Sequence, residues 1–186
     1  LQLDIPKHWF DKGFTEIQSM FGIQPPTNNQ VILRAIIRRK LTSLTPTHAA
    51  VSRESFIIKQ LGDSLLNYDS SQHTLLPGIA HHWQVSGDTK HFTFFLRNSV
   101  QFHHGRTLTS QDVRFTLERA CSADSIVKWQ MKDIETIECP SDFIISIHLK
   151  KADPFFCRYL AMCSLVILPY DVSFNEKQWI ATGPFK

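Results

Sequence analysis

One segment, residues 86–121, constrains the fold more than any other part of the chain. Ser86-Gly87-Asp88 is a hairpin turn signal, and apolar residues then alternate with more polar ones over residues 92–97, as in a strand with one buried face. Thr109 stands three residues before Asp112, an arrangement typical of the capping box that begins a helix. The stripe expected to face inward on this helix consists of Val113, Leu117, Ala120 and Cys121. The segment therefore predicts a strand hairpin followed by an amphipathic helix.

The other apolar patterns predict short elements on both sides of this segment. Apolar residues at helical spacing predict helices over about 13–21, 52–66 and 154–161. β-Branched or alternating runs predict strands over 31–37, 134–137, 143–147 and 165–168. Small polar residues, Pro and Gly predict a linker at 25–29 and turns at 67–71, 98–99 and 139–142.

Size and composition are those of an ordinary globular chain. With 186 residues, of which 42% are hydrophobic, the chain is long enough to bury a core without a metal or a disulfide. A net charge of +3 gives no argument for nucleic-acid binding. Apolar runs such as Leu165 to Leu168 are far shorter than a membrane span needs. Because the chain begins with Leu1 and carries no secretory signal, we expect a removed signal or excision from a longer protein.

The cysteines and histidines give no metal pattern. Cys121, Cys139, Cys157 and Cys163 form no C-x-x-C pair, so we expect free, buried thiols, which fit a cytoplasmic protein. His81, His82, His91, His103 and His104 fall within 24 residues, but no Asp or Glu adjoins either His pair. Adjacent histidines on a strand point to opposite faces, and convergence would need the segments around Phe92 and Phe102 to pair. Turn and strand-end roles are favoured, and neither a metal nor a cofactor is predicted.

No constellation for catalysis assembles. The sequence has no G-x-S-x-G elbow, no S-x-x-K at the start of a predicted helix and no Gly-rich phosphate loop among its 7 glycines. Glu135 and Glu138, the nearest to a carboxylate pair, are expected to be solvated. We therefore predict that the protein is not an enzyme.

A longer pattern of spaced residues runs from Leu76 to Arg119. Its members are Ala80, Trp83, Asp88, Leu96, Arg97, Val100, Phe102, His103, Gly105, Leu108, Thr109, Asp112 and Val113. The pattern resembles the signature of the family 5 extracytoplasmic solute-binding proteins, the oligopeptide, dipeptide and nickel binders. The flanks at 44–46, 144–155 and 181–185 resemble the same family, so the resemblance covers about residues 31–186.

The resemblance implies an α/β fold with a mixed, α+β-like sheet. Residues 31–186 would form the first, N-terminal lobe of a periplasmic-binding-protein-like type II clamshell, and residues 1–30 a leader helix and linker. The doubled histidines His81-His82 and His103-His104 are similar to those of SgrR-type transcriptional regulators. In these proteins a winged-helix DNA-binding domain precedes a solute-binding-like domain kept in the cytoplasm, and that DNA-binding domain is not in this chain.

In such a clamshell a small molecule binds between two lobes and shifts the open–closed population. Positions expected to face the ligand are Thr45, Thr47, His48, Ser52, Ser55 and Trp129. Motif residues interpreted as scaffold are Trp83, Leu96, Arg97, Phe102, His103, Gly105, Thr109 and Asp112.

The resemblance leaves three functions open. The first is a cytoplasmic sensor of a sugar or sugar phosphate that acts on DNA only through a domain outside this chain. The second is the periplasmic or extracellular, membrane-associated receptor of an ABC transporter for peptides or nickel. The third is an interaction module that has lost its ligand. The expected partners are the small-molecule ligand and a second lobe of the same protein.

Overall fold

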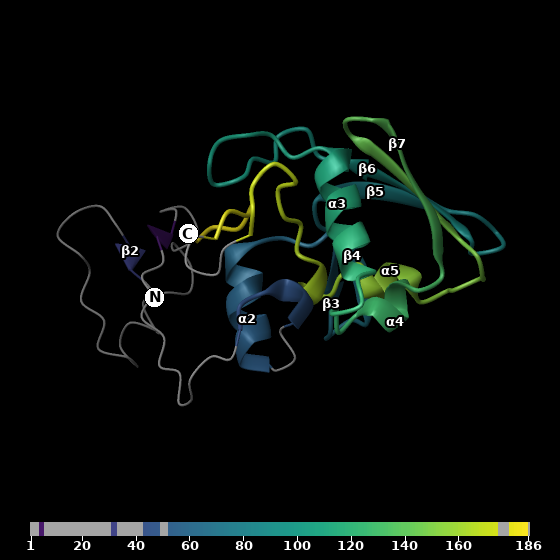
Figure 1. Cartoon of the computed structure of the whole chain (residues 1–186), viewed down its shortest axis with the longest axis horizontal. Helices are drawn as coiled ribbons and strands as arrows, with labels where there is room; N and C mark the ends of the chain where they lie inside the picture. Colours follow the sequence, from purple (N-terminus) through teal and green to yellow (C-terminus); the bar gives the residue numbers. More distant parts are fainter. Residues whose placement is uncertain (1–3, 6–30, 33–42, 49–51, 175–178, 186) are drawn as a thin grey trace.

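The computed structural model describes residues 4–5, 31–32, 43–48, 52–174 and 179–185 (Figure 1). The predicted helix at 13–21, the linker at 25–29 and most of the predicted strand at 31–37 lie outside these residues. The start of that strand is β2 (Val31–Ile32), which pairs in antiparallel fashion with β1 (Asp4–Ile5).

A four-stranded antiparallel sheet forms the larger part of the molecule. Its strands are β5 (Ala80–Val85), β6 (His91–Leu96), β7 (Ile134–Ser141) and β8 (Ile144–Leu149), in the order β5-β6-β8-β7. The turn predicted at residues 86–88 joins β5 to β6, and the two strands pair as an antiparallel hairpin. The alternation predicted over residues 92–97 is therefore confirmed as β6.

The two faces of this sheet differ because successive side chains of a strand point to opposite sides. On the inner face, Phe92 and Phe94 of β6 lie opposite Ile147 and Ile145 of β8, and all four are buried. On the outer face, the facing pairs of these two strands are His91 with His148, Thr93 with Ser146, and Phe95 with Ile144, all half-buried or exposed.

Helix α3 (Ser110–Ala120) packs against β7 and β8, as Figure 1 shows. Its N-terminus is the predicted capping box, in which the Thr109 amide donates to Asp112 Oδ2 at 2.8 Å. Val113, Leu117 and Ala120 face the core as predicted. The prediction for Cys121 was wrong: the helix ends at Ala120, so Cys121 becomes the C-cap and is exposed.

Helix α2 (Ser52–Leu61) is shorter than the helix predicted over 52–66. It ends before Gly62, whose backbone lies too close to the side chains of Val166 and Ala181 for any larger residue. Leu66 instead begins β3 (Leu66–Asp69), which pairs with β4 (Thr74–Pro77), so the turn predicted at 67–71 begins three residues too early. The apolar residues keep helical spacing up to Leu66, but the close packing around Gly62 ends the helix at Leu61.

Three further predictions in the C-terminal half need correction. Strand β7 continues to Ser141, so the turn predicted at 139–142 moves to Asp142 and Phe143. The helix predicted over 154–161 shortens to α5 (Phe156–Tyr159), and α4 (Lys128–Met131) is an additional short helix. The strand predicted over 165–168 is instead the end of η3 (Cys163–Leu165) followed by one isolated bridge between Val166 and Ser64.

The segment 165–168 is apolar because it separates two hydrophobic clusters. Leu165 and Ile167 belong to the sheet core, the cluster between the four-stranded sheet, α3 and α5. Val166 and Leu168 belong to the α2 core, which also contains Ile58, Leu61 and Trp179. Successive side chains of this segment thus enter different cores. All four residues are therefore apolar, although the segment does not form a strand of a sheet.

All four cysteines are free, as predicted. Cys157 is buried, and desolvation, assisted by Asp153, raises the pKa of its thiol to about 11. Cys139 and Cys163 are half-buried, so the prediction of buried thiols holds fully only for Cys157.

Candidate ligand-binding site

Two of the residues expected to face a ligand lie in a tight turn that contacts the segment before α4. The turn is η2 (Pro46–His48), closed by a hydrogen bond from the His48 amide to the Thr45 carbonyl at 2.9 Å. The Thr47 carbonyl accepts a hydrogen bond from the Ile126 amide at 3.0 Å. Thr47 is buried, with Oγ1 3.2 Å from Nδ1 of the exposed His48, and Thr45 is half-buried.

Trp129 lies near this contact in sequence, because it belongs to α4, which begins two residues after Ile126. Its side chain is 68% exposed, the largest fraction among the exposed large hydrophobic residues of the described chain. Lys128 and Lys132 place their ammonium groups 5.8 and 5.6 Å from the centre of its rings. An exposed indole flanked by two cations can stack on a flat or sugar-like ligand and attract a negative charge.

The remaining predicted contact residues lie on α2. Ser52 is the first residue of α2, and its side chain lies outside what the structure describes. Ser55 is half-buried in the first turn. Glu54, between them, is almost completely buried. Its position at the start of a helix does not by itself predict this burial.

Asp112, one of the motif residues interpreted as scaffold, carries a completely buried carboxylate. Arg106 donates from Nη1 and Nη2 to the two oxygens of Asp112 at 3.0 and 2.6 Å, and from Nη2 to Asp171 at 2.7 Å. The Arg106 guanidinium also lies 5.0 and 4.9 Å from the ring centres of Phe102 and Tyr170. The hydrogen bond to Asp112 is the main reason why the pKa of Arg106 is raised. The sequence analysis did not single out Arg106.

His103 links the motif to residues 181–183 by hydrogen bonds. Its backbone amide donates to the Ala181 carbonyl at 2.8 Å, and the Ala181 amide donates to His103 Nδ1 at 3.3 Å. Its ring nitrogens also face two backbone carbonyls, with Nδ1 3.3 Å from that of Trp179 and Nε2 2.8 Å from that of Gly183. These hydrogen bonds give His103 a structural role.

The other motif residues have structural surroundings as well. Leu96 is buried, and Trp83 is half-buried against the sheet core, opposite Phe94. Arg97 donates from Nε to the Gly78 carbonyl at 3.0 Å. Gly105 has a φ of +92°, a backbone conformation that favours glycine.

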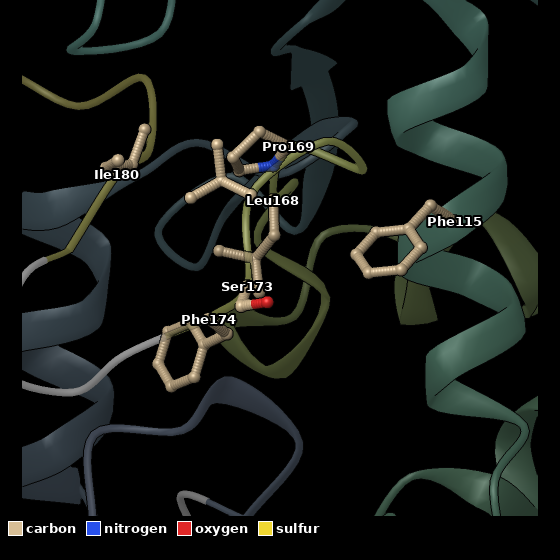
Figure 2. Close-up of a pocket in the computed structure, with 7 residues that line it drawn as sticks. Phe115, Leu168, Pro169, Ser173, Phe174 and Ile180 are labelled. Atoms are coloured by element: carbon tan, nitrogen blue, oxygen red, sulfur yellow. The ribbon is translucent and has the colours of Figure 1, made fainter.

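Two hollows lie beside α3, away from η2 and Trp129. Figure 2 shows the smaller one, where Phe115 of α3 points toward Leu168 and Pro169, with Phe174 and Ile180 on the other side. Its volume of about 10 Å³ holds no more than one water molecule. An open hollow of about 460 Å³ lies against Arg114, Glu118 and Tyr170. Neither is lined by a residue that the sequence analysis expected to face a ligand.

The described residues carry no site for a chelated metal with three ligands, since no three His, Cys, Asp or Glu side chains gather closely enough. None of the helices in the described ranges is both long and apolar enough to cross a membrane.

An antiparallel sheet covered by helices, with an exposed aromatic at one turn, defines a mixed α/β ligand-binding domain of the periplasmic-binding-protein-like type II kind. Residues 74–186 match the family described as bacterial extracellular solute-binding proteins, family 5 Middle. The chain belongs to this family, as its motif from Leu76 to Arg119 predicted.

Three individual proteins illustrate the relationship. The chain is similar to the HTH-type transcriptional regulator SgrR of Pectobacterium atrosepticum, with 33% identity over 158 residues, which cover 83% of this chain and 27% of SgrR. It is 31% identical over 175 residues to YhjP of Bacillus subtilis, covering 91% of this chain and 30% of YhjP. The solved structure of AgaA from A. tumefaciens R10, in complex with agropinic acid, superposes with a TM-score of 0.71 at 27% identity and covers 79% of this chain and 31% of AgaA.

The chain therefore spans less than a third of the length of these relatives. Solute-binding proteins and transcriptional regulators bind ligands or control transcription and are not classes of enzyme.

Proposed function

We propose that this chain is part of the ligand-sensing region of a transcriptional regulator similar to SgrR. Residues 31–186 form the first lobe of its solute-binding domain, and residues 1–30 a leader. The ligand is a sugar or a sugar phosphate, and its binding is relayed to a winged-helix DNA-binding domain in another part of a longer, cytoplasmic protein. The similarity to a protein named as a transcriptional regulator, at 33% identity over most of the chain, supports this proposal.

The exposed Trp129 between Lys128 and Lys132 is the observation that carries the choice of ligand. The apolar face of a sugar ring stacks well on an indole, and the two ammonium groups favour a ligand with a negative charge. His48 is exposed on the turn that contacts the segment before α4, so its ring is available to the same ligand, whereas Thr47 is buried and positions this turn. An uncharged peptide would gain nothing from the two lysines.

The experiment is a calorimetric titration of the full-length protein with glucose 6-phosphate, glucose, a dipeptide and Ni²⁺. We expect saturable binding of the sugar phosphate, and about tenfold weaker binding for Trp129→Ala and for the double variant Lys128→Gln, Lys132→Gln, equivalent to about 1.4 kcal/mol. Lys59→Gln, a change of an exposed lysine on α2, is the control and should bind like the wild type.

A transporter receptor for peptides or nickel is the second candidate, supported by the match to a family described as extracellular solute-binding proteins. Saturable binding of the dipeptide or of Ni²⁺, with no response to the sugar phosphate, would establish this candidate instead. If none of the four compounds binds, both proposals fail and an interaction module without a ligand is left.

A further inference from the structure

Two histidines that are 57 positions apart in sequence meet on the outer face of the four-stranded sheet. His91 of β6 lies directly opposite His148 of β8. The Leu149 amide donates to the Lys90 carbonyl at 2.8 Å, which makes Lys90 and Leu149 a hydrogen-bonded pair and His91 and His148 the adjacent non-hydrogen-bonded pair. In pairs of this kind the facing side chains come closest, at about 4.5 to 5.5 Å between Cβ atoms.

The two imidazoles point their Nδ1 atoms at each other. The Nδ1 atoms are 2.6 Å apart, the ring centres 4.5 Å apart, and the ring planes are nearly perpendicular. His91 is exposed and His148 half-buried, so ions in solution reach the pair.

Asp88 orients the His91 ring from the other side. Its Oδ2 lies 3.9 Å from His91 Nε2, the ring nitrogen that does not face His148. The carboxylate is fixed by hydrogen bonds from Ser86 Oγ at 2.5 Å and the Lys90 amide at 3.1 Å, both to Oδ1.

The carboxylate lies on the side of the His91 ring away from His148. A negative group beside Nε2 favours a proton on that nitrogen, and this tautomer leaves a lone pair on Nδ1 of His91, which faces Nδ1 of His148. A carboxylate, a histidine and a free Nδ1 lone pair in this order form the arrangement that supports histidines bound to metal ions.

We propose that His91 and His148 form a site for a divalent transition-metal ion of the zinc or copper class, which the two Nδ1 atoms bind together. Imidazole nitrogen suits these metals. Zinc–nitrogen bonds of about 2.0 to 2.1 Å at a tetrahedral angle place two ligand nitrogens about 3.3 Å apart, so the rings need to separate by only about 0.7 Å.

The protons balance without any further reactant. When the ion binds, the Nδ1 proton of His148 leaves to water and the ring takes a proton at Nε2, so both rings stay neutral. The described residues supply no third ligand, since no group of three ligating side chains is present. Water molecules complete the coordination, and the site remains open to an additional ligand. It lies on the sheet face opposite the buried core and is independent of the ligand proposed above.

Zinc calorimetry of the full chain, in a non-chelating buffer with a phosphine reductant, tests this site. We expect one Zn²⁺ ion to be lost from the stoichiometry in His91→Gln and in His148→Gln. Asp88→Asn should retain the site with about tenfold weaker binding, the effect expected of a group that orients a metal ligand. His81→Gln, which removes an exposed histidine of β5 in the same sheet, is the control and should titrate like the wild type.

Histidine ring nitrogen NMR gives a readout that does not depend on the free cysteines. Zn²⁺ should shift the Nδ1 signals of two histidines, and these shifts should vanish in both single variants. The proposal is overturned if Zn²⁺ fails to bind the wild type, or if His91→Gln and His148→Gln keep the full stoichiometry. In either case the pair is only a cross-strand hydrogen bond.

Discussion

Replacing Asp112 by alanine should destabilise the fold more than any other change of a single charged residue in the motif. Its side chain is completely buried and accepts hydrogen bonds from Arg106, from Thr109 and from the Tyr170 amide at 3.1 Å. The substitution removes the helix cap and the partner of Arg106, and it leaves the Tyr170 amide without its acceptor.

The magnitude follows from these contacts. Breaking a buried ion pair from one side costs about 3 to 5 kcal/mol. Arg106 is partly exposed and keeps Asp171 as a second partner, so we expect the low end, about 3 kcal/mol. With an m-value of about 2 kcal/mol per M of urea, the unfolding midpoint should fall by about 1.5 M.

Urea unfolding followed by tryptophan fluorescence and circular dichroism measures this change. Asp171→Asn is the matched control, because Asp171 binds the same Arg106 but is exposed, and it should cost no more than about 1 kcal/mol. The reasoning is refuted if Asp112→Ala and Asp171→Asn destabilise the protein equally, since burial of the carboxylate would then make no difference.

Further predictions concern three glycines and one thiol. Gly183→Ala should cost about 2 kcal/mol or more in urea unfolding, because its new Cβ would lie 2.5 Å from the Leu61 carbonyl carbon. Gly105→Ala should cost about 1 to 2 kcal/mol through its φ of +92° alone, whereas Gly87→Ala, with open space around it, should be nearly neutral; equal costs would contradict this. Stability should fall as the pH rises from about 9 to 11, because the unfolded chain releases the Cys157 proton first, and Cys157→Ala should flatten this slope.

The parts of the fold that follow from local patterns were predictable. The alternation over residues 92–97 fixed a strand, and Thr109 with Asp112 fixed the start of α3, because both signals act between neighbours in sequence. Helical spacing failed at Leu65 and Leu66, where packing around Gly62 decides. The apolar run at 165–168 misled because a segment between two cores has the same composition as a buried strand.

Long-range contacts account for what sequence reasoning missed at the candidate sites. Nothing local connects Thr47 with Ile126, or Arg106 with Asp171, since each pair joins different elements. The cluster of five histidines in the sequence includes His91 but not its partner, His148. The pairing of these two histidines can be recognised only from the structure, in which β8 lies beside β6.

The end of α2 is joined to the C-terminal segment by several hydrogen bonds. Asp63 and Thr182 are joined by two hydrogen bonds, from the Asp63 amide to Thr182 Oγ1 at 3.1 Å and from that hydroxyl to Asp63 Oδ2 at 2.9 Å. The Gly183 amide donates to the Leu61 carbonyl at 3.1 Å. These bonds hold the end of α2 against residues 182 and 183, although 119 positions separate Asp63 from Thr182. The Thr182 hydroxyl both accepts from the Asp63 amide and donates to the Asp63 carboxylate, so one side chain closes a stretch of chain that contains the whole four-stranded sheet.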